Sequence, residues 1–278
     1  MPSILLHLIN ALLYAGGGAY FWRTRWRFAT VPAISTEVRQ SPGWEHAVIL
    51  VPLALHAWLL YSTMFKADGL YLGVGTALSA IAWLTMLIYW LASLFYRQEG
   101  LQTLILPVAA VAVLLPVIFP ALKPLAHTEV PAFKFHLVLS MLAYSLFTIA
   151  SLHVLLMALL ERRLHGGAVK RAPRWMPPLL TMEALLFRII GAGFVLLTLV
   201  LVSGIFFSEE VFGKPLSFSH KTIFAFLSWG IFAALLAGRS AYGWRGRVAV
   251  RWTLAGFLTL VLAYLGSKFV LEILLGRG

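Results

Sequence analysis

Long apolar runs alternate along this chain with short polar connections, and each run has about the length of a membrane-crossing helix. Such a helix needs about 20 predominantly apolar residues to cross the hydrocarbon core of a bilayer. The runs predict eight spans, at residues 3–22, 44–65, 70–95, 101–119, 133–160, 184–207, 221–238 and 252–275. A transmembrane β-barrel would instead show short segments of alternating polarity. The pattern therefore predicts an all-α polytopic membrane protein, a bundle of about eight transmembrane helices forming a single transmembrane domain over residues 1–278.

The basic residues are unevenly distributed between the connections. Most of them follow the first, third, fifth and seventh spans, among them Arg23, Arg97, Arg162 and Arg239. Because Lys and Arg gather on the cytoplasmic side of membrane proteins, this bias predicts that both the N- and C-termini lie outside. The net charge of +12 is then explained by orientation in the lipid bilayer, and nucleic acid is not expected as a partner.

Composition and motifs exclude several classes of function. The charged residues make up 12% of the chain, against about 25% in a typical soluble domain, and there is no cysteine for disulfide, thiolate or thiol redox chemistry. The sequence has no Gly-rich phosphate loop, HExxH zinc motif or Ser–His–Asp order, so we expect no stand-alone enzyme. No carboxylate pair lies at mid-membrane, which disfavours an ion-coupled transporter.

The histidines are the main candidates for chemistry. His56 lies inside the second predicted span, and an ionisable residue at that depth is a candidate functional group. Four others lie at the predicted outer ends of spans or in outer connections: His7, His127, His136 and His220. An imidazole in a helix can ligate a metal, but it can equally be a hydrogen-bonded interior group. Both interpretations are open for each residue.

One of these histidines begins a polar stripe on the fifth predicted span. His136, Ser140, Tyr144, Thr148 and Ser151 follow one another at spacings of three or four residues, which places them on one helical face. In a bilayer such a face should contact protein. It can serve interhelical hydrogen bonding, or it can direct His136 toward His220, where two imidazoles could ligate one haem iron from opposite sides.

Residues 183–247 resemble the cytochrome c assembly family, the CcsA- and CcmC-like haem-handling membrane proteins, and within it the eight-span YpjD- or HemX-like branch. The resemblance rests on residues that stay in step with the family pattern: Gly193-Phe194, Leu197-Thr198, Ser203-Gly204, Gly213, Ser217, Lys221, Ala225 to Trp229, Arg239 and Gly243-Trp244. It implies a multi-pass protein of the bacterial inner membrane, haem as cofactor, and other cytochrome c assembly proteins or a membrane complex as partners. It also implies two outward-facing axial histidines beside a tryptophan-rich loop.

The chain departs from the family pattern inside that loop. Phe212, Leu216 and Phe218 stand where the family has tryptophans, and Ser219-His220 replaces an Asp-Pro pair. Ala237 stands at the family's membrane-embedded histidine. His136 matches the upstream axial ligand, whereas His220 is a substitute for the second.

Two expectations follow from the resemblance and its departures. In the first, the protein binds or handles haem, with His136 and His220 as iron ligands, the aromatic side chains of Phe212, Phe218 and Trp229 around the porphyrin, and His56 as a possible internal site. In the second, it is an accessory membrane protein derived from the family that no longer binds haem and acts through a partner complex.

Overall fold

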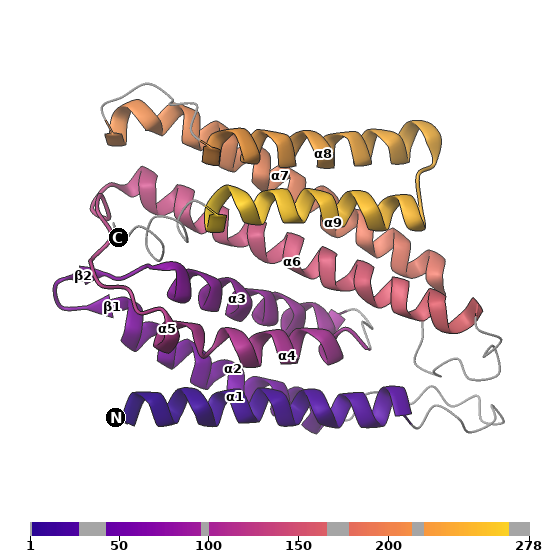
Figure 1. Cartoon of the computed structure of the whole chain (residues 1–278), viewed down its shortest axis with the longest axis horizontal. Coiled ribbons are helices and arrows are strands. Elements are labelled where there is room, and N and C mark those ends of the chain that lie inside the picture. The colour runs from indigo at the N-terminus through magenta and orange to yellow at the C-terminus, as the bar shows by residue number, and fades with distance from the viewer. Residues whose placement is uncertain (1, 28–42, 96–99, 166–177, 213–219, 267–278) are drawn as a thin grey trace.

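The computed structural model describes residues 2–27, 43–95, 100–165, 178–212 and 220–266, and successive spans in this part of the chain, with the short fourth span counted as one, run in opposite directions (Figure 1). The long helices are α1 (Pro2–Phe21), α2 (Gly43–Met64), α3 (Val74–Phe95), α6 (Pro131–His165), α7 (Leu179–Phe212), α8 (His220–Tyr242) and α9 (Arg247–Val261). Seven helical stretches of the described residues are long and apolar enough to cross a membrane. The prediction of an all-α polytopic membrane protein is thereby confirmed.

The fourth predicted span is a broken helix. It consists of α4 (Gln102–Ala112) and α5 (Leu115–Ile118), and the two together are shorter than the other spans. The break precedes Pro116, which lies in the first turn of α5, where the missing N–H of proline is tolerated. Gly75 of α3 lets this segment approach, because a Cβ there would clash with the carbonyl oxygen of Leu115.

A short hairpin that the hydrophobic pattern did not predict joins α2 to α3. Strands β1 (Phe65–Lys66) and β2 (Gly69–Leu70) pair antiparallel, with Lys66 opposite Gly69. The hydroxyl group of Tyr71 donates a hydrogen bond to Asp68 at this turn. The bond lowers the pKa of the Asp68 carboxyl group and raises the pKa of the Tyr71 hydroxyl group. The Asp68-Gly69 pair is a turn signal that could have predicted this hairpin.

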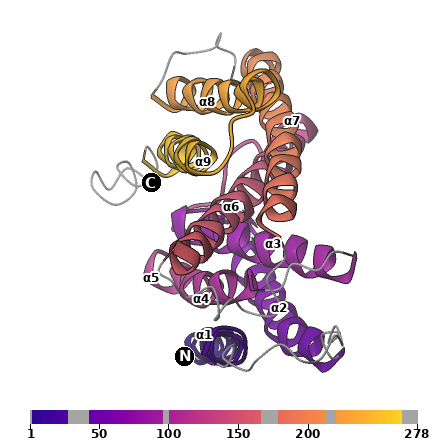
Figure 2. The same ribbon diagram turned by 90° about the vertical axis from the view of Figure 1, so that its right-hand side faces the viewer.

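Helix α6 lies between two groups of helices, α1 to α5 on one side and α7 to α9 on the other (Figure 2). It packs against α3 of the first group and against α7 and α9 of the second. Aromatic side chains also join α6 to the second group. The rings of Phe147 on α6 and Phe232 on α8 stack with centroids 4.0 Å apart. Gly193 of α7 leaves room for Phe147, since a Cβ at that position would lie 3.1 Å from the ring. The long middle helix therefore fixes how the flanking helices present their ends.

The alternating helix directions give the bundle two distinct ends (Figure 1). At one end, which we call the hairpin end, lie β1 and β2 and the first residues of α6 and α8. At the other, which we call the basic end, α6 and α8 terminate and α9 begins, near Arg162, Arg239 and Arg247. The separation agrees with the predicted sorting of basic residues, while the orientation of the ends across the membrane stays a prediction.

Two boundaries at the basic end differ from the sequence prediction. Helix α9 begins at Arg247 and π-helical residues Leu262–Gly266 (η3) continue it, whereas the predicted span begins at residue 252. Helix α1 is likewise continued by π-helical residues Trp22–Arg27 (η1). Arginine ends an apolar run in a hydropathy pattern, but its long side chain can reach water from a helix end, so the helix extends through it.

Candidate functional site

His136 lies in the second turn of α6 at the hairpin end, and its half-buried imidazole faces α7. Its Nδ1 atom lies 2.8 Å from the hydroxyl oxygen of Ser203. Gly204 lies beside the ring, and a Cβ at Gly204 would make an ordinary contact of 3.4 Å with the Cε1 atom of His136. The Ser203-Gly204 pair of the family pattern therefore forms the wall against which this imidazole rests.

The hydrogen bonds of Ser203 indicate which tautomer His136 adopts. The Ser203 hydroxyl group donates its single proton to the carbonyl oxygen of Val200, at 3.0 Å. The oxygen of Ser203 is then an acceptor toward His136, so Nδ1 carries the proton and donates it. The lone pair on Nε2 is left available for a ligand. A histidine that binds a metal commonly donates its other ring N–H to a neighbouring group in this way.

Two other motif residues of α7 position Trp229 of α8. The indole Nε1–H donates to the hydroxyl oxygen of Thr198 at 2.9 Å. Its ring stacks on Phe194, with centroids 5.4 Å apart. Trp229 is half-buried between the two helices, so the family-pattern pairs on α7 align α8 with α7 as well as holding His136.

His220 is the first residue of α8 and is exposed. It begins α8 at the same end of the bundle at which α6 begins, and α7 packs against both helices (Figure 1). The structure thus brings the two predicted ligands to one end, on helices that flank α7. No hydrogen bond or ring contact joins the two imidazoles, both of which are described. Phe212 is the last residue of α7, with a side chain that is not described, and Phe218 lies outside the described residues.

His56 lies in a buried polar cluster of the other helix group. Its Nε2 atom is 2.8 Å from the hydroxyl oxygen of Ser79 on α3, and its Nδ1 atom is 3.3 Å from the hydroxyl oxygen of Tyr14 on α1. His7 and Asn10 are buried on the same face of α1 as Tyr14. Both ring nitrogens of His56 therefore have partners inside the bundle, and the ring itself is fully buried.

The polar stripe on α6 is used mainly within the protein. Tyr144 donates to the carbonyl oxygen of Leu260 on α9 at 2.8 Å, an interhelical bond. Ser140 and Thr148 donate to carbonyl oxygens one turn earlier in α6 itself. Only His136 in this stripe combines an anchored nitrogen with a free one. No group of three or more His, Asp or Glu side chains in the described part of the chain is arranged to hold a metal ion.

A contact that the sequence did not reveal orders the start of α9. The carboxylate of Glu183 on α7 accepts a hydrogen bond of 2.6 Å from the backbone N–H of Gly246. Gly246 has a φ of +57°, which glycine adopts without strain, and it directly precedes the helix. Arg239 lies over the ring of Phe187 at 4.8 Å to the centroid. These contacts are structural, and their only sequence signal is the position of Glu183 near a helix end.

The fold and its apolar helices define a polytopic α-helical membrane protein. Residues 45–275 match the model of the family described as "Cytochrome C assembly protein". The chain belongs to this cytochrome c assembly family.

Individual relatives give the same result over much of the chain. The "Inner membrane protein YpjD" of Escherichia coli (strain K12) is 30% identical over 250 residues, which cover 85% of this chain and 91% of that protein. The "Cytochrome c biogenesis protein CcsA" of Synechocystis sp. is 33% identical over 121 residues, 44% of this chain and 35% of that protein. No solved structure matches this chain. These likenesses and the apolar helices assign the chain to the bacterial inner membrane as a multi-pass protein.

Proposed function

We propose that this protein binds haem at the hairpin end of its bundle, with His136 and His220 as the axial ligands of the iron, and handles that haem in cytochrome c assembly. The observation that carries the proposal is the hydrogen-bonding state of His136. Its Nδ1–H is held by Ser203, so its Nε2 lone pair is both fixed in direction and unused. Ser203 is itself fixed by Val200, which limits rotation of the imidazole.

The second ligand is proposed on position and chemistry. His220 is exposed at the first residue of α8, at the end of the bundle where α6 presents His136. Axial histidine is a common ligand of haem iron. A cofactor held between α6 and α8 would cross α7 beside Ser203 and Gly204, which lie more than two turns before the end of that helix. The relatives named CcsA are cytochrome c biogenesis proteins, which supports haem as the cofactor and cytochrome c assembly proteins as partners.

The aromatic side chains have different parts in this proposal. Phe212 and Phe218 lie in the eight residues that precede His220 in the sequence and would pack on the porphyrin. Trp229 lies in the third turn of α8 and would act indirectly, by keeping α8 in register with α7 through Thr198. His56 is retained as an interior group, because ligation there would require it to release Ser79 or Tyr14.

One observation favours the second candidate, an accessory protein that binds no haem and acts through a partner complex. The family-pattern residues Phe194 and Thr198 are engaged in packing with Trp229, and Phe147 occupies the space beside Gly193. The motif thus has a complete structural use without a cofactor. Retention of the motif would then preserve the fold rather than a haem site.

Absorption spectroscopy of the full-length protein purified from haem-replete cells separates the two candidates. We expect a Soret band in the wild type, loss of most of it in His136→Gly and in His220→Gly, and its partial return when imidazole is added. Recovery by imidazole shows that the helices still form the pocket. A monodisperse wild-type protein without a Soret band would support the accessory role.

His127→Asn is the matched control for these variants. His127 lies at the hairpin end between α5 and α6 and has a φ of +61°, a conformation that asparagine tolerates. This change removes an exposed imidazole from the same end without altering α6 or α8, so the Soret band should persist. An equal loss in the control and in the ligand variants would refute the assignment of His136 and His220.

A further inference from the structure

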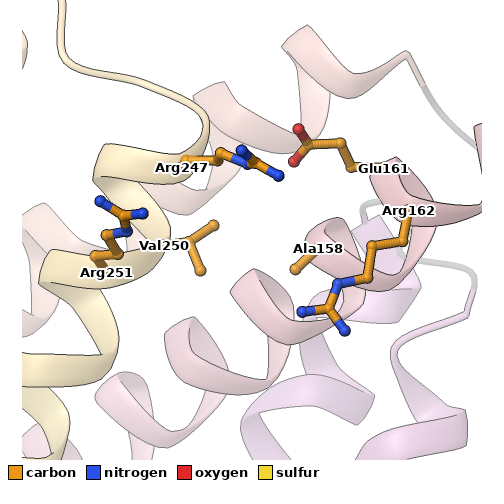
Figure 3. A pocket seen from close by; sticks show the side chains of 6 residues that line it. All are labelled: Ala158, Glu161, Arg162, Arg247, Val250 and Arg251. Atoms are coloured by element: carbon orange, nitrogen blue, oxygen red, sulfur yellow. The ribbon is translucent and has the colours of Figure 1, made fainter. Parts of the chain in front are cut away.

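A cavity of about 700 Å³ lies between α6 and α9 at the basic end, and the haem proposal makes no use of it. Ala158, Glu161 and Arg162 line it from α6, and Arg247, Val250 and Arg251 line it from α9 (Figure 3). On each helix the lining positions follow a spacing of three and four residues, so each helix presents one face to the cavity. The guanidinium group of Arg247 and the carboxylate of Glu161 point toward one another across it (Figure 3).

The charges around this cavity are unbalanced. Three arginines and one glutamate line it, which leaves an excess of two positive charges. None of the three guanidinium groups has a hydrogen-bond or ion-pair partner among the described residues. Arg247 also occupies the first turn of α9, where the helix dipole disfavours cations and stabilises anions. A bound anion would relieve both the mutual repulsion and the unfavourable dipole.

The position of the cavity along the helices indicates the source of that anion. The apolar part of α6 ends at Arg162, and the apolar part of α9 begins at Arg247. These residues therefore lie at the level where a bilayer carries its phosphate groups. The half-buried side chains of Ala158 and Val250 give the cavity apolar walls on the membrane side. Arginine also matches phosphate oxygens with paired N–H donors better than lysine does.

We propose that this cavity binds the phosphate groups of an anionic phospholipid headgroup. Arg247 and Arg162 would hold phosphate oxygens from the two helices, while Arg251, one turn deeper in α9, would reach them from the membrane side. Glu161 would limit the net attraction for the phosphate groups. The chemistry recognised is a phosphate ester, which a soluble metabolite could also supply, so the test separates a membrane source from a soluble one.

The test compares two double variants of the full chain by native mass spectrometry. Arg247→Gln with Arg251→Gln removes two charges from the cavity, and Arg23→Gln with Arg245→Gln removes two exposed charges that do not line it. Each protein is reconstituted with phosphatidylcholine and a minor fraction of cardiolipin or phosphatidylglycerol, and retained lipid is counted. We expect the cavity variant to retain about tenfold less anionic lipid than the control. Equal losses would overturn the proposal in favour of general charge attraction.

Two further measurements complete the test. Glu161→Gln removes the carboxylate but keeps the arginines, so retention of anionic lipid should rise; a fall would overturn the proposal even if the double variant misfolds. In the soluble arm, glycerol 3-phosphate is added to wild-type protein in phosphatidylcholine alone. Binding that matches the affinity for anionic lipid and depends on Arg247 and Arg251 would retain the phosphate site but overturn its lipid source.

Discussion

His56 and His136 are both histidines within membrane-spanning helices, but they differ in whether a ring nitrogen remains available to a ligand. His56 is fully buried, and Ser79 and Tyr14 occupy its two nitrogens. His136 is half-buried, and only its Nδ1 atom is occupied, by Ser203. Depth in the membrane is therefore a weaker indication of ligation than an unused ring nitrogen whose direction is fixed.

The environments follow from the helices that surround each ring. His56 on α2 is fully buried, and its hydrogen bonds reach α1 through Tyr14 and α3 through Ser79. His136 is near the end of α6, where α7 alone supplies its partner. A polar side chain that is enclosed inside the bundle becomes part of its packing. A polar side chain that is held at the end of the bundle keeps one of its sides accessible to a ligand. The same residue type therefore contributes to stability in one region and to a candidate site in the other.

The largest expected effect concerns His56 and its two buried hydrogen-bond partners, Ser79 and Tyr14. His56→Ala should lower the free energy of unfolding by about 3 kcal/mol, because it opens a cavity and leaves the hydroxyl groups of Ser79 and Tyr14 without their partner. Titration with denaturing detergent in mixed micelles, followed by tryptophan fluorescence, measures the change. The haem content of the folded fraction should equal that of the wild type.

His127→Asn serves as the control for this prediction, since it removes an exposed histidine and should leave stability unchanged. A loss of haem from folded His56→Ala protein would contradict the assignment of His56 as an interior packing group. It would return His56 to the set of haem ligands.

The next effect concerns the anchor of His136. Ser203→Ala removes the acceptor that holds Nδ1–H, so the imidazole is free to rotate and to exchange tautomers. Losing such an outer partner typically weakens metal binding by about tenfold or more. Haem titration of the purified apoprotein, read at the Soret band, measures the affinity. Stability should change less than in His56→Ala, because His136 is half-buried and its freed N–H can bond to water.

Gly204→Ala is the matched control for Ser203→Ala. Its added methyl group would meet Cε1 of His136 at 3.4 Å, an ordinary contact, and would leave the serine in place. Haem affinity should therefore stay at the wild-type level. If both alanine variants lost affinity equally, general disturbance of the α6–α7 contact would explain the result, and the anchor would have no special part.

Much of the fold could be predicted because a membrane imposes length and polarity on each helix. The apolar runs predicted the seven long spans and the position of the fourth, which is a broken helix. The start of α9 was missed, because Arg247 and Arg251 end the apolar run but not the helix. A hydropathy pattern reflects how readily side chains transfer to lipid. The length of a helix depends instead on its backbone hydrogen bonds, which can continue through arginine residues.

The candidate site could be predicted only in part. The stripe on α6 predicted the face that carries His136, but not that Ser203 would hold one nitrogen and leave the other free. That partner lies 67 positions away in the chain, and only packing of α6 against α7 brings it close. The depth of His56 was evident from the sequence, whereas its saturation by Ser79 and Tyr14 was not. Local patterns give faces and depths, and hydrogen-bond partners require the tertiary contacts.

The smallest expected effect concerns Asn10, which lies on the same face of α1 as Tyr14. Asn10 is fully buried on α1, and neither its amide nitrogen nor its amide oxygen has a partner among the described residues. Replacing an unpaired polar group by an apolar one of similar shape removes a desolvation cost, so Asn10→Leu should raise the free energy of unfolding by about 1 kcal/mol. The detergent titration used for His56→Ala measures this change as well.

The sign of the change in unfolding free energy for Asn10→Leu shows whether Asn10 belongs to the hydrogen-bonded cluster of His56. Stabilisation by leucine would show that Asn10 stands apart from the bonds of His56 and contributes nothing to them. Destabilisation by more than about 1 kcal/mol would contradict this, and would indicate a buried water that links the amide to the cluster, since such waters satisfy polar groups that protein alone leaves unpaired. Combining Asn10→Leu with His56→Ala then decides the matter, because independent sites add and members of one network do not.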